Sequence, residues 1–589
     1  MLISAAPILV LFRLIAMWRF NLLHGYWRFT GVDDASDIVK ASAVGSLAFL
    51  VIIRFGLGVQ AFPISVYVIE GVFFAFLLAS VRLGFRILAE ASLRMPATSP
   101  RKQVVIIGAG FAAQMIVREL TGTASGYWIV GCLDDDPKKR GTKIIGKPVL
   151  GTVDNLPELA AAHRIDEVLI AVPSASGAQM RRFVEACQKA RLKFATVPSL
   201  QDLIAGRARI QDIRPVDVND LLGRDPVKID MESVRSVLEG QTVMVTGAAG
   251  SIGSELCRQI LRYNPARLLC LDQNETGLFY LQFELNSAIA SFWVADYTNA
   301  EYMENLLSRQ AVQIIFHAAA YKHVPLMEDN PNEAIQNNVI GLDRFIQVAD
   351  RAQCRSFVMI SSDKAVNPSS LMGATKRIGE LLLCSKPTSG MRCVSVRFGN
   401  VLGSQGSVIP VFQKQLAEQR RITVTHPDIT RYFMTISEAV SLVLQASAIG
   451  VHRDILVLDM GEPIRITDLA RTLIRLSGKS EDDVEIVYTG LRPGEKLYEE
   501  LFYDYETVLN TECSKIKRAQ TATLPWKDMR ATLDALRAVK VKGTEYEIRA
   551  MVKVIVPEYT FGDLTNDVGS AAVPLRKAHD RYAGASATD

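Results

Sequence analysis

An acid and an amine stand next to each other in this chain, and together they could move protons to and from a substrate. Asp363 and Lys364 directly follow Ser362. A carboxyl group and an amine differ in proton affinity, so one can serve as acid while the other serves as base. Met372 stands four residues before Lys376, so the two share one face of a helix. The Met372 thioether neither gives nor takes a proton, so any proton transfer to or from a substrate beside it must be done by other groups or by water.

A glycine-rich run upstream predicts a phosphate-binding turn. Gly247, Gly250 and Gly253 follow the apolar run 243–245, which predicts a buried parallel strand. Asp272 ends the next apolar run about twenty residues later, where a carboxylate accepts from a ribose 2′-hydroxyl. This spacing predicts a Rossmann-type dinucleotide site and favours NAD over NADP. The residues expected to contact the cofactor are Gly247, Gly250, Ser251, Ile252, Gly253, Asp272, Asp296, Tyr297, Ala318, Ala319, Ala320 and Lys376.

Six ordered motifs between about residues 231 and 502 resemble those of the nucleotide-sugar 4,6-dehydratases of bacterial polysaccharide biosynthesis. The motifs are TGAAGSIGSEL (246–256), HAAAYKHVPLMEDNP (317–331), SSDKAVNPSSLMGATK (361–376), RFGNVLGSQGSVIPVF (397–412), DITRYFM (428–434) and GLRPGEKLYEE (490–500). These enzymes are extended short-chain dehydrogenases, which present Tyr-x-x-x-Lys from a helix. Met372 holds the tyrosine position here and Lys376 the lysine position. A second possibility is that Met372 only fills the core while another tyrosine, such as Tyr321, enters the site.

The resemblance implies an internal redox cycle in which NAD takes a hydride from C4 of the sugar and returns it at C6, with loss of water across C5 and C6. Lys364 is expected to be the base at C5 and Asp363 the acid at the C6 hydroxyl. The C4 hydroxyl proton is assigned to Asp363 or to a water held by Ser362, and Lys376 is expected to anchor the nicotinamide ribose. A lysine base must be partly neutral, and we expect burial and nearby positive charge to lower its pKa.

The substrate contacts implied by the resemblance lie mainly beyond residue 397. Asn400 resembles the family residue that reaches the sugar or its pyrophosphate. Arg431 and Arg492 resemble phosphate or uridine contacts, where the guanidinium fork suits diphosphate oxygens, although either could be an ordinary surface ion pair. Lys322 and His323 follow the fourth expected strand of this domain and are further candidates for substrate binding.

Composition excludes several other classes of protein. A net charge of +4 over 589 residues gives no electrostatic argument for nucleic-acid binding. The eight cysteines show no C-x-x-C or Cys/His ligand spacing, so neither a zinc site nor a disulfide framework is expected, and no metal is predicted. The hydrophobic content of 49% is high for a purely soluble enzyme, which indicates that part of the chain lies in a membrane.

Three apolar stretches at about 2–18, 41–57 and 64–81 each approach the length that crosses a bilayer. The distribution of Lys and Arg predicts that the N-terminus lies outside and that everything after residue 85 is cytoplasmic. Residues 1–95 are therefore expected to form a multi-pass anchor in the bacterial inner membrane. The large membrane-bound branch of the family, which this chain resembles, acts on UDP-N-acetylglucosamine and usually has four spans, so one span is expected to be missing at the N-terminus.

A second Rossmann-like unit is predicted at 101–222. Gly108, Gly110 and Ala113 follow an apolar run at the spacing G-x-G-x-x-A, and an acidic run begins at Asp134. This unit either holds a dinucleotide or serves only packing or oligomerisation. The catalytic domain is expected at 231–535, the linker at about 207–227, and a disordered tail at 562–589.

The predicted fold is α/β, with transmembrane helices followed by two doubly wound Rossmann-like domains, the second carrying a small C-terminal substrate subdomain. The predicted activity is that of a hydro-lyase that converts UDP-N-acetylglucosamine to UDP-2-acetamido-2,6-dideoxy-xylo-hexos-4-ulose for capsule, O-antigen or glycoprotein glycans. We expect a homo-oligomer. Two alternatives are a UDP-sugar 4-epimerase, which the Asp363-Lys364 pair and the missing tyrosine disfavour, and a non-catalytic scaffold that binds nucleotide sugars in a glycan assembly complex.

Overall fold

The structure is a computed structural model. It describes residues 2–20, 22, 32–56, 63–92, 102–122, 126–197, 214–216, 229–418, 421–477, 479 and 481–561. The chain divides into two compact units, one of residues 1–173 and 189–214 and the other of residues 174–188 and 215–589. Most of the linker expected at 207–227, and all of the tail expected at 562–589, lie outside the described residues.

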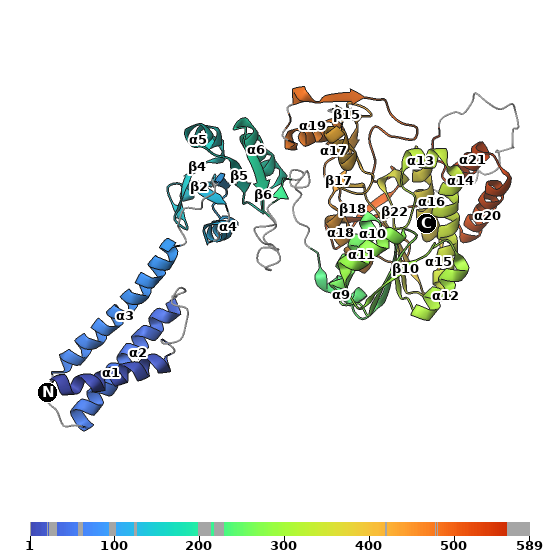
Figure 1. Cartoon of the computed structure of the whole chain (residues 1–589). Helices are drawn as coiled ribbons and strands as arrows, with labels where there is room; N and C mark the ends of the chain where they lie inside the picture. Colours follow the sequence, from blue (N-terminus) through green and yellow to red (C-terminus); the bar gives the residue numbers. More distant parts are fainter. Residues whose placement is uncertain are drawn as a thin grey trace. The chain divides into compact units, whose positions relative to one another are not determined.

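Three helices, drawn in blue in Figure 1, open the chain: α1 (Leu2–Arg19), α2 (Val32–Val51) with a short π-helical continuation, and α3 (Ile64–Ser92). Within the described residues, two segments are long and apolar enough to cross a membrane, Asp34–Phe55 and Ile64–Phe85. Two of the three expected spans therefore meet this test of length and composition.

A buried polar cluster joins the three helices. Arg13 of α1 donates from Nε to Glu70 Oε1 of α3 at 3.1 Å and forms a second, shorter contact with the other carboxylate oxygen. The same guanidinium donates to the Ser42 carbonyl and to Ser46 Oγ of α2, both at 2.7 Å. A charge among apolar helices needs such partners, because an unpaired charge in a bilayer is costly. The arginine inside the first apolar stretch is thus part of the packing of the bundle.

The first sheet has the order β3-β4-β2-β1-β5-β6-β7. Its central strands β1 (Lys102–Ile107), β2 (Tyr127–Leu133), β5 (Glu167–Ile170) and β6 (Lys193–Thr196) are mutually parallel. Val104, Ile106, Ile129 and Leu169 form part of its core with helix α4 (Phe111–Gly122). The predicted Rossmann-like pattern of parallel strands is confirmed for this region.

The second sheet has nine strands in the order β10-β9-β8-β11-β12-β13-β18-β22-β21. Seven are parallel, and β22 and β21 run antiparallel at one edge. The strands are β8 (Thr242–Thr246), β9 (Arg267–Asp272), β10 (Ala290–Val294), β11 (Ile314–His317), β12 (Ser356–Ile360), β13 (Arg392–Arg397), β18 (Asp454–Leu458), β21 (Thr507–Asn510) and β22 (Ile516–Gln520).

The direction of winding reverses between β8 and β11. From β8 the chain proceeds through β9 to β10, and β11 then returns to the other side of β8. In doubly wound folds, ligands bind beyond the carboxyl ends of the strands at such a switch point. The glycine turn after β8 and the end of β11 therefore border the expected ligand crevice.

Helix α16 (Leu371–Ser385) carries Met372 and Lys376 and lies within the second unit (Figure 1). Ser370 caps it by accepting from the Gly373 amide at 3.1 Å. Most of its side chains are buried on all sides, including Ala374 and Ile378, so the helix is held rigidly by the core around it.

A smaller subdomain packs around α17 (Val408–Glu418), α19 (Ile466–Leu476) and the parallel pair β15 (Arg421–Val424) and β20 (Glu485–Tyr488), with a core of its own. The main core also continues through α20 (Trp526–Lys542) and α21 (Glu545–Ile555) to Tyr559. The core of the domain expected at 231–535 thus continues beyond residue 535, because these two amphipathic helices cover it.

Candidate active site

A cavity of about 880 Å³ lies at the carboxyl ends of the strands of the second sheet. Its wall brings together residues from motifs that are far apart in the sequence. The predicted site residues that line it are Gly247, Gly250, Ser251, Ile252, Gly253, Asp272, Tyr297, Ala318, Ala319, Ala320, Lys322, His323, Ser362, Lys364, Met372, Lys376, Asn400, Arg431 and Arg492. Two predicted site residues, Asp296 and Asp363, do not line it.

The glycine turn packs against neighbouring backbone so closely that side chains would not fit. Gly247 has a φ of +72°, and a Cβ on it would lie 2.7 Å from the Ala319 amide nitrogen. A Cβ on Gly253 would lie 2.0 Å from the Gly247 carbonyl oxygen, so only glycine lets helix α10 (Ser251–Leu261) pack against the turn. Gly250 caps α10 without a side chain. The N-terminus of the helix is therefore open to a phosphate group.

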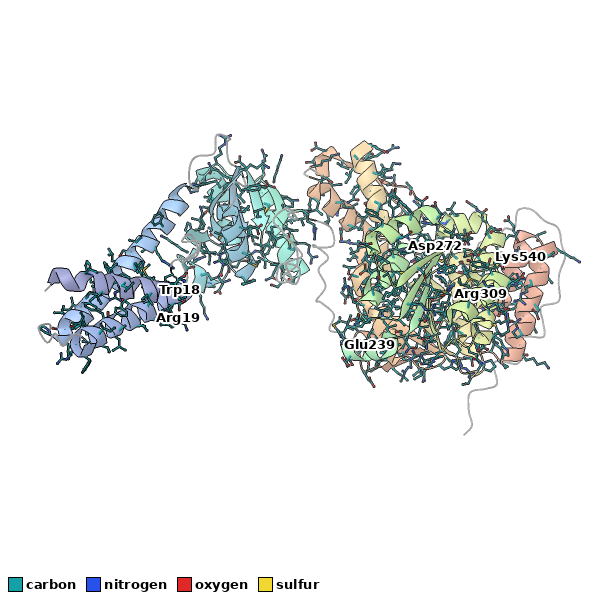
Figure 2. The ribbon with its side chains drawn as sticks, turned by 60° about the horizontal axis from the view of Figure 1, so that its bottom comes forward. Trp18, Arg19, Glu239, Asp272, Arg309 and Lys540 are labelled. Carbon is teal, nitrogen blue, oxygen red and sulfur yellow. The ribbon has the colours of Figure 1, made fainter. Side chains whose placement is uncertain are left out.

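Asp272 ends β9 beside this turn and is labelled in Figure 2. Its Oδ2 accepts from the Ala249 amide at 2.9 Å, and its Oδ1 accepts from the Asn274 amide at 2.9 Å. Each oxygen keeps a further lone pair, and the residue lines the cavity, so the carboxylate can accept from a ribose hydroxyl.

Asp296 and Tyr297 have structural contacts. Asp296 Oδ1 accepts from the Thr298 amide at 2.8 Å in an exposed turn. The buried Tyr297 hydroxyl donates to the Asn337 carbonyl at 2.6 Å, and burial raises its pKa. Tyr297 lines the cavity, whereas Asp296 does not.

Asp363 lies behind the cavity wall. Its side chain is 0% exposed, and its Oδ1 accepts from Ser362 Oγ at 2.9 Å and from Lys364 Nζ at 3.0 Å. Its Oδ2 has no hydrogen-bond partner among the described residues. The Asp363 amide is held by the Phe398 carbonyl at 3.0 Å, which fixes the start of the turn. The carboxylate therefore meets Lys364 and not the space where a substrate would lie.

Lys364 reaches the cavity with several polar neighbours. Its Nζ donates to Asn400 Oδ1 at 3.1 Å and lies 3.7 Å from Glu499 Oε1. Burial lowers the pKa of its ammonium group, but the carboxylates of Asp363 and Glu499 raise it more, so the net pKa is above its ordinary value. This is opposite to the expected lowering, because the ion pair with Asp363 and the approach of Glu499 together outweigh the effect of burial.

Met372 and Lys376 both line the cavity from α16. Met372 also belongs to the main core, so its side chain both lines the cavity and packs against core residues. Lys376 Nζ donates to the Ile360 carbonyl at 2.9 Å, and burial lowers its pKa to about 8. Tyr321, the alternative tyrosine, lies on the wall as well.

Two of the side chains predicted to bind the substrate, Arg431 and Lys322, donate hydrogen bonds within the protein. Arg431 donates to the Thr430 carbonyl at 2.7 Å and to the Lys496 carbonyl at 2.8 Å. Lys322 Nζ donates to the Gln405 carbonyl at 3.0 Å. Arg492 is exposed at the wall. Of the two arginines, Arg492 is thus the one whose side chain is more open to a phosphate.

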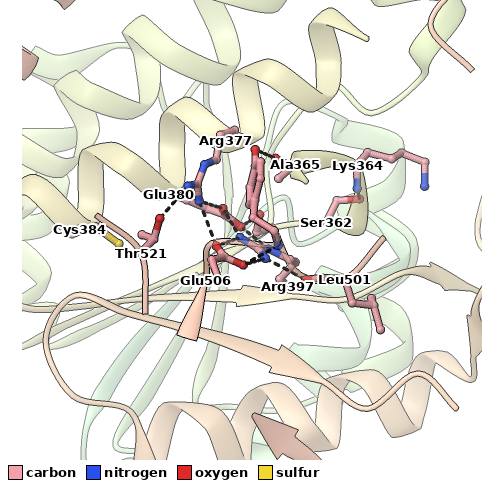
Figure 3. Close-up of polar contacts among 12 residues, drawn as sticks. Ser362, Lys364, Ala365, Arg377, Glu380, Cys384, Arg397, Leu501, Glu506 and Thr521 are labelled. Atoms are coloured by element: carbon pink, nitrogen blue, oxygen red, sulfur yellow. Dashed lines mark hydrogen bonds and ion pairs between the residues drawn. The ribbon is translucent and has the colours of Figure 1, made fainter. Parts of the chain in front are cut away.

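A buried ionic cluster, which was not predicted from the sequence, lies next to the turn that carries Ser362 and Lys364 (Figure 3). Arg397 pairs with Glu380 at 2.8 Å and with Glu506 at 2.9 Å, and all three side chains are fully buried. Ser361 Oγ donates to Glu380 Oε1 at 2.7 Å, which ties the strand end to the cluster. The three-residue spacing of Arg377 and Glu380, which pair at 3.0 Å, was a local signal, but it did not indicate the distant Glu506.

The family described as polysaccharide biosynthesis protein matches residues 243–521, and the family described as CoA-binding domain matches residues 26–198. The chain is 37% identical over 529 residues to the capsular polysaccharide biosynthesis protein CapD of Staphylococcus aureus, covering 88% of each chain. It is 38% identical over 515 residues to the probable polysaccharide biosynthesis protein EpsC of Bacillus subtilis, covering 85% of this chain and 84% of the relative.

A further relative covers less than half of the chain. The chain is 33% identical over 270 residues to a UDP-glucose 4-epimerase of Rickettsia prowazekii, covering 44% of this chain and 77% of the relative. The similarity to CapD and EpsC extends through both Rossmann-like regions, whereas the similarity to the epimerase is confined to less than half of the chain.

Proposed function

Because this chain belongs to the polysaccharide biosynthesis protein family, we propose that it is a nucleotide-sugar 4,6-dehydratase acting on UDP-N-acetylglucosamine. The product is the UDP-4-keto-6-deoxy-N-acetylhexosamine of xylo configuration. The observation that carries the proposal is the amine of Lys364, held in the cavity beside the glycine turn with Met372 where a catalytic tyrosine would otherwise stand.

The cavity suits NAD as its resident cofactor. The N-terminus of α10, which Gly250 caps without a side chain, would receive the pyrophosphate. Asp272 would accept from the ribose hydroxyls, and Lys376 would donate to the ribose next to the nicotinamide. NAD bound there supplies the hydride acceptor and donor that the sugar needs at C4 and C6.

The remaining chemistry belongs to side chains of the protein. Lys364 takes the C5 proton, which the C4 ketone makes acidic. Asp363 holds Lys364 in place through the contact at 3.0 Å, and Asn400 fixes the same amine from the sugar side at 3.1 Å. Arg492 and Lys322 bind the diphosphate. The acid expected at Asp363 can reach the substrate only through Lys364, because the carboxylate is fully buried.

We place the enzyme at the inner membrane of a bacterium, with the N-terminal helices as anchor and the catalytic unit in the cytoplasm. The apolar segments Asp34–Phe55 and Ile64–Phe85 support this placement. A catalytic unit in the cytoplasm has access to the UDP-sugars there. We also expect the enzyme to be a homo-oligomer.

The test uses full-length protein purified in detergent. Denaturation should release NAD, and incubation with a panel of UDP-sugars should yield, by mass spectrometry, a product of UDP-N-acetylglucosamine that has lost one water. A product of unchanged mass with an inverted C4 would favour the 4-epimerase, in line with the epimerase relative. Absence of both NAD and conversion across the panel would favour the non-catalytic scaffold and would overturn the proposal.

A further inference from the structure

A second carboxyl group faces the cavity close to Lys364. Glu499 lies in the segment after β20, lines the cavity and is 8% exposed. Its Oε1 lies 3.7 Å from Lys364 Nζ and 3.7 Å from Arg431 Nε. Its buried Oε2 has no hydrogen-bond partner within the part of the chain that the structure describes. A buried carboxylate usually accepts several hydrogen bonds, so this oxygen is available to a ligand or holds a proton itself.

Glu499 and Asp363 differ in what they can reach. Asp363 is fully buried, and its Oδ1 already accepts from Ser362 and Lys364. Asp363 Oδ2 and Glu499 Oε2 both lack a hydrogen-bond partner among the described residues, but only Glu499 lines the cavity. The charged groups that face Glu499 are Lys364, Asp363, Arg431 and Lys496.

Burial and the nearby Asp363 carboxylate raise the pKa of the Glu499 carboxyl group, against the opposing effect of the positive groups. The raised pKa favours the acid form that a general acid needs.

We propose that Glu499 is the general acid that protonates the departing C6 hydroxyl, and that it shares a proton with Lys364 before the reaction; this inference rests on the proposed dehydration. Lys364 as an ammonium ion cannot act as a base. Transfer of its proton to Glu499 produces a neutral amine and a neutral carboxylic acid, with no change in the number of protons in the site. The pair then holds the base and the acid at the same time.

The elimination step balances with these two groups. Lys364 Nζ takes the C5 proton, and the electron pair of that C–H bond forms the C5–C6 double bond. The C6–O bond breaks with its electron pair, and the departing hydroxyl takes the Glu499 proton and leaves as water. When a hydride later reaches C6, C5 takes a proton back from Lys364. The C4 hydroxyl proton passes earlier to a water held by Ser362, and after the elimination that water returns it to Glu499, so both groups end the turnover as they began.

The test compares Glu499→Gln with Glu500→Gln in the full-length enzyme. Glu500 is the matched control, because it carries the same group one residue further along, is 47% exposed, pairs with Lys496 at 2.8 Å and does not itself line the cavity. Product formation and solvent deuterium at C5 of the recovered substrate are both followed in heavy water. A third variant, Glu499→Asp, keeps the acid and should retain more activity than Glu499→Gln.

We expect Glu499→Gln to slow product formation about 10²-fold or more, the range for loss of a general acid. Exchange at C5 should persist in this variant at alkaline pH, where Lys364 can lose its proton to solvent instead. The rate of the wild type should be nearly flat across neutral pH, whereas the residual rate of the variant should rise with pH. Glu500→Gln should behave as wild type in all three respects.

Three results would count against the inference, and they can be told apart. Wild-type turnover in Glu499→Gln would overturn the role of Glu499 alone. Loss of C5 exchange together with product at every pH, with NAD content and melting temperature unchanged, would show that Glu499 only positions Lys364. A wild-type enzyme that forms no dehydrated product would overturn the proposed function, and the inference with it.

Discussion

Two glycine-rich turns in this chain begin in the same way and end differently. Each follows a buried parallel strand, and each opens with a glycine of positive φ, +102° at Gly108 and +72° at Gly247. Each is also bound by an aspartate that follows or ends the neighbouring strand. Asp134 accepts from the turn amide of Ala109 at 2.7 Å, in the same manner as Asp272 in the second unit. The turn and its aspartate therefore belong to the fold that both regions share.

The two aspartates face different surroundings. Asp134 also accepts from Lys139 Nζ at 2.9 Å, whereas Asp272 lines a cavity. The helix after the first turn carries Ala113 where the second carries Gly253, which is the position that has no room for a Cβ. Glycine spacing alone thus identifies the fold, whereas an aspartate that is open to a ligand and close helix packing distinguish the region that we propose to be catalytic.

The largest difference between the two regions is expected at their lysines. Lys364→Met and Asp363→Asn should each lower dehydration by about 10³-fold or more, since they remove the base or its fixed contact, while NAD stays bound. Lys139→Met, at the aspartate of the first region, should leave turnover unchanged. Turnover and released NAD are measured on the same preparations, and near-normal turnover in Lys364→Met would refute the assignment of the base.

A second contrast concerns glycines. A Cβ on Gly253 would lie 2.0 Å from the Gly247 carbonyl oxygen, whereas a Cβ on Gly110 would meet nothing within 4 Å. Gly253→Ala should cost about 3 kcal/mol of stability or cofactor binding, because the helix must move away from the turn. Gly110→Ala should cost little. Melting temperature and NAD content report the effect, and equal values for the two variants would show that the close packing has no energetic consequence.

A third contrast lies where the central strands end. In the second sheet, His317 is paired in register with Thr246, and the His317 Nδ1 lies 2.8 Å from the Thr246 Oγ1. At the corresponding place in the first sheet, Ile170 is paired with Ile107. Burial lowers the pKa of His317 to about 3, with a smaller effect from Lys376. The unfolded histidine takes up its proton near pH 6.5 and the folded one only near pH 3, so its contribution to stability is lost as pH falls between these values.

The expected loss is at most about 1.4 kcal/mol per pH unit within that window. Hydrogen exchange of β11 peptides against β5 peptides measures the free energy of opening at pH 7 and pH 5. His317→Met should reduce the pH dependence of β11 and leave that of β5 unchanged. An identical dependence in wild type and variant would show that other groups account for the acid sensitivity.

The smallest contrast concerns the aspartates themselves. Asp272→Asn should weaken NAD binding about tenfold, equivalent to about 1.4 kcal/mol, because a charged acceptor for the ribose is lost. The same change should reduce the preference for NAD over NADP. Asp134→Asn should alter neither property, as Lys139 already occupies that carboxylate. Competition binding with both cofactors measures this, and equal losses in the two variants would place the cofactor in both regions or in neither.

Much of the fold and the outline of the site could be predicted from the sequence. Continuous apolar runs predicted β8 and β9, and the glycine spacing with Asp272 predicted which strand ends meet. Four-residue spacing placed Met372 and Lys376 on one helix face, and both lie on the cavity wall. These features depend on local spacing, which the sequence displays directly.

Features that depend on distant pairing could not be predicted. The full burial of Asp363 results from the packing of its turn against the Phe398 carbonyl, which the local motif does not encode. The approach of Glu499 to Lys364 joins segments that are more than a hundred residues apart, and it adds to the effect of Asp363 in raising the Lys364 pKa. The pairing of Asp134 with Lys139 is local, but the acidic run alone does not show which carboxylate is bound.

The central claim is that the second unit removes a hydride from C4, eliminates water and returns the hydride at C6 within one active site. UDP-N-acetylglucosamine deuterated at C4 tests it most directly, with the positions of label in the product read by NMR. We predict a 4-keto-6-deoxy product that carries the deuterium at C6, and one solvent deuterium at C5 in the xylo configuration when heavy water is used. Return of the label to C4 without exchange at C5, or its loss to free reduced cofactor, would contradict the account.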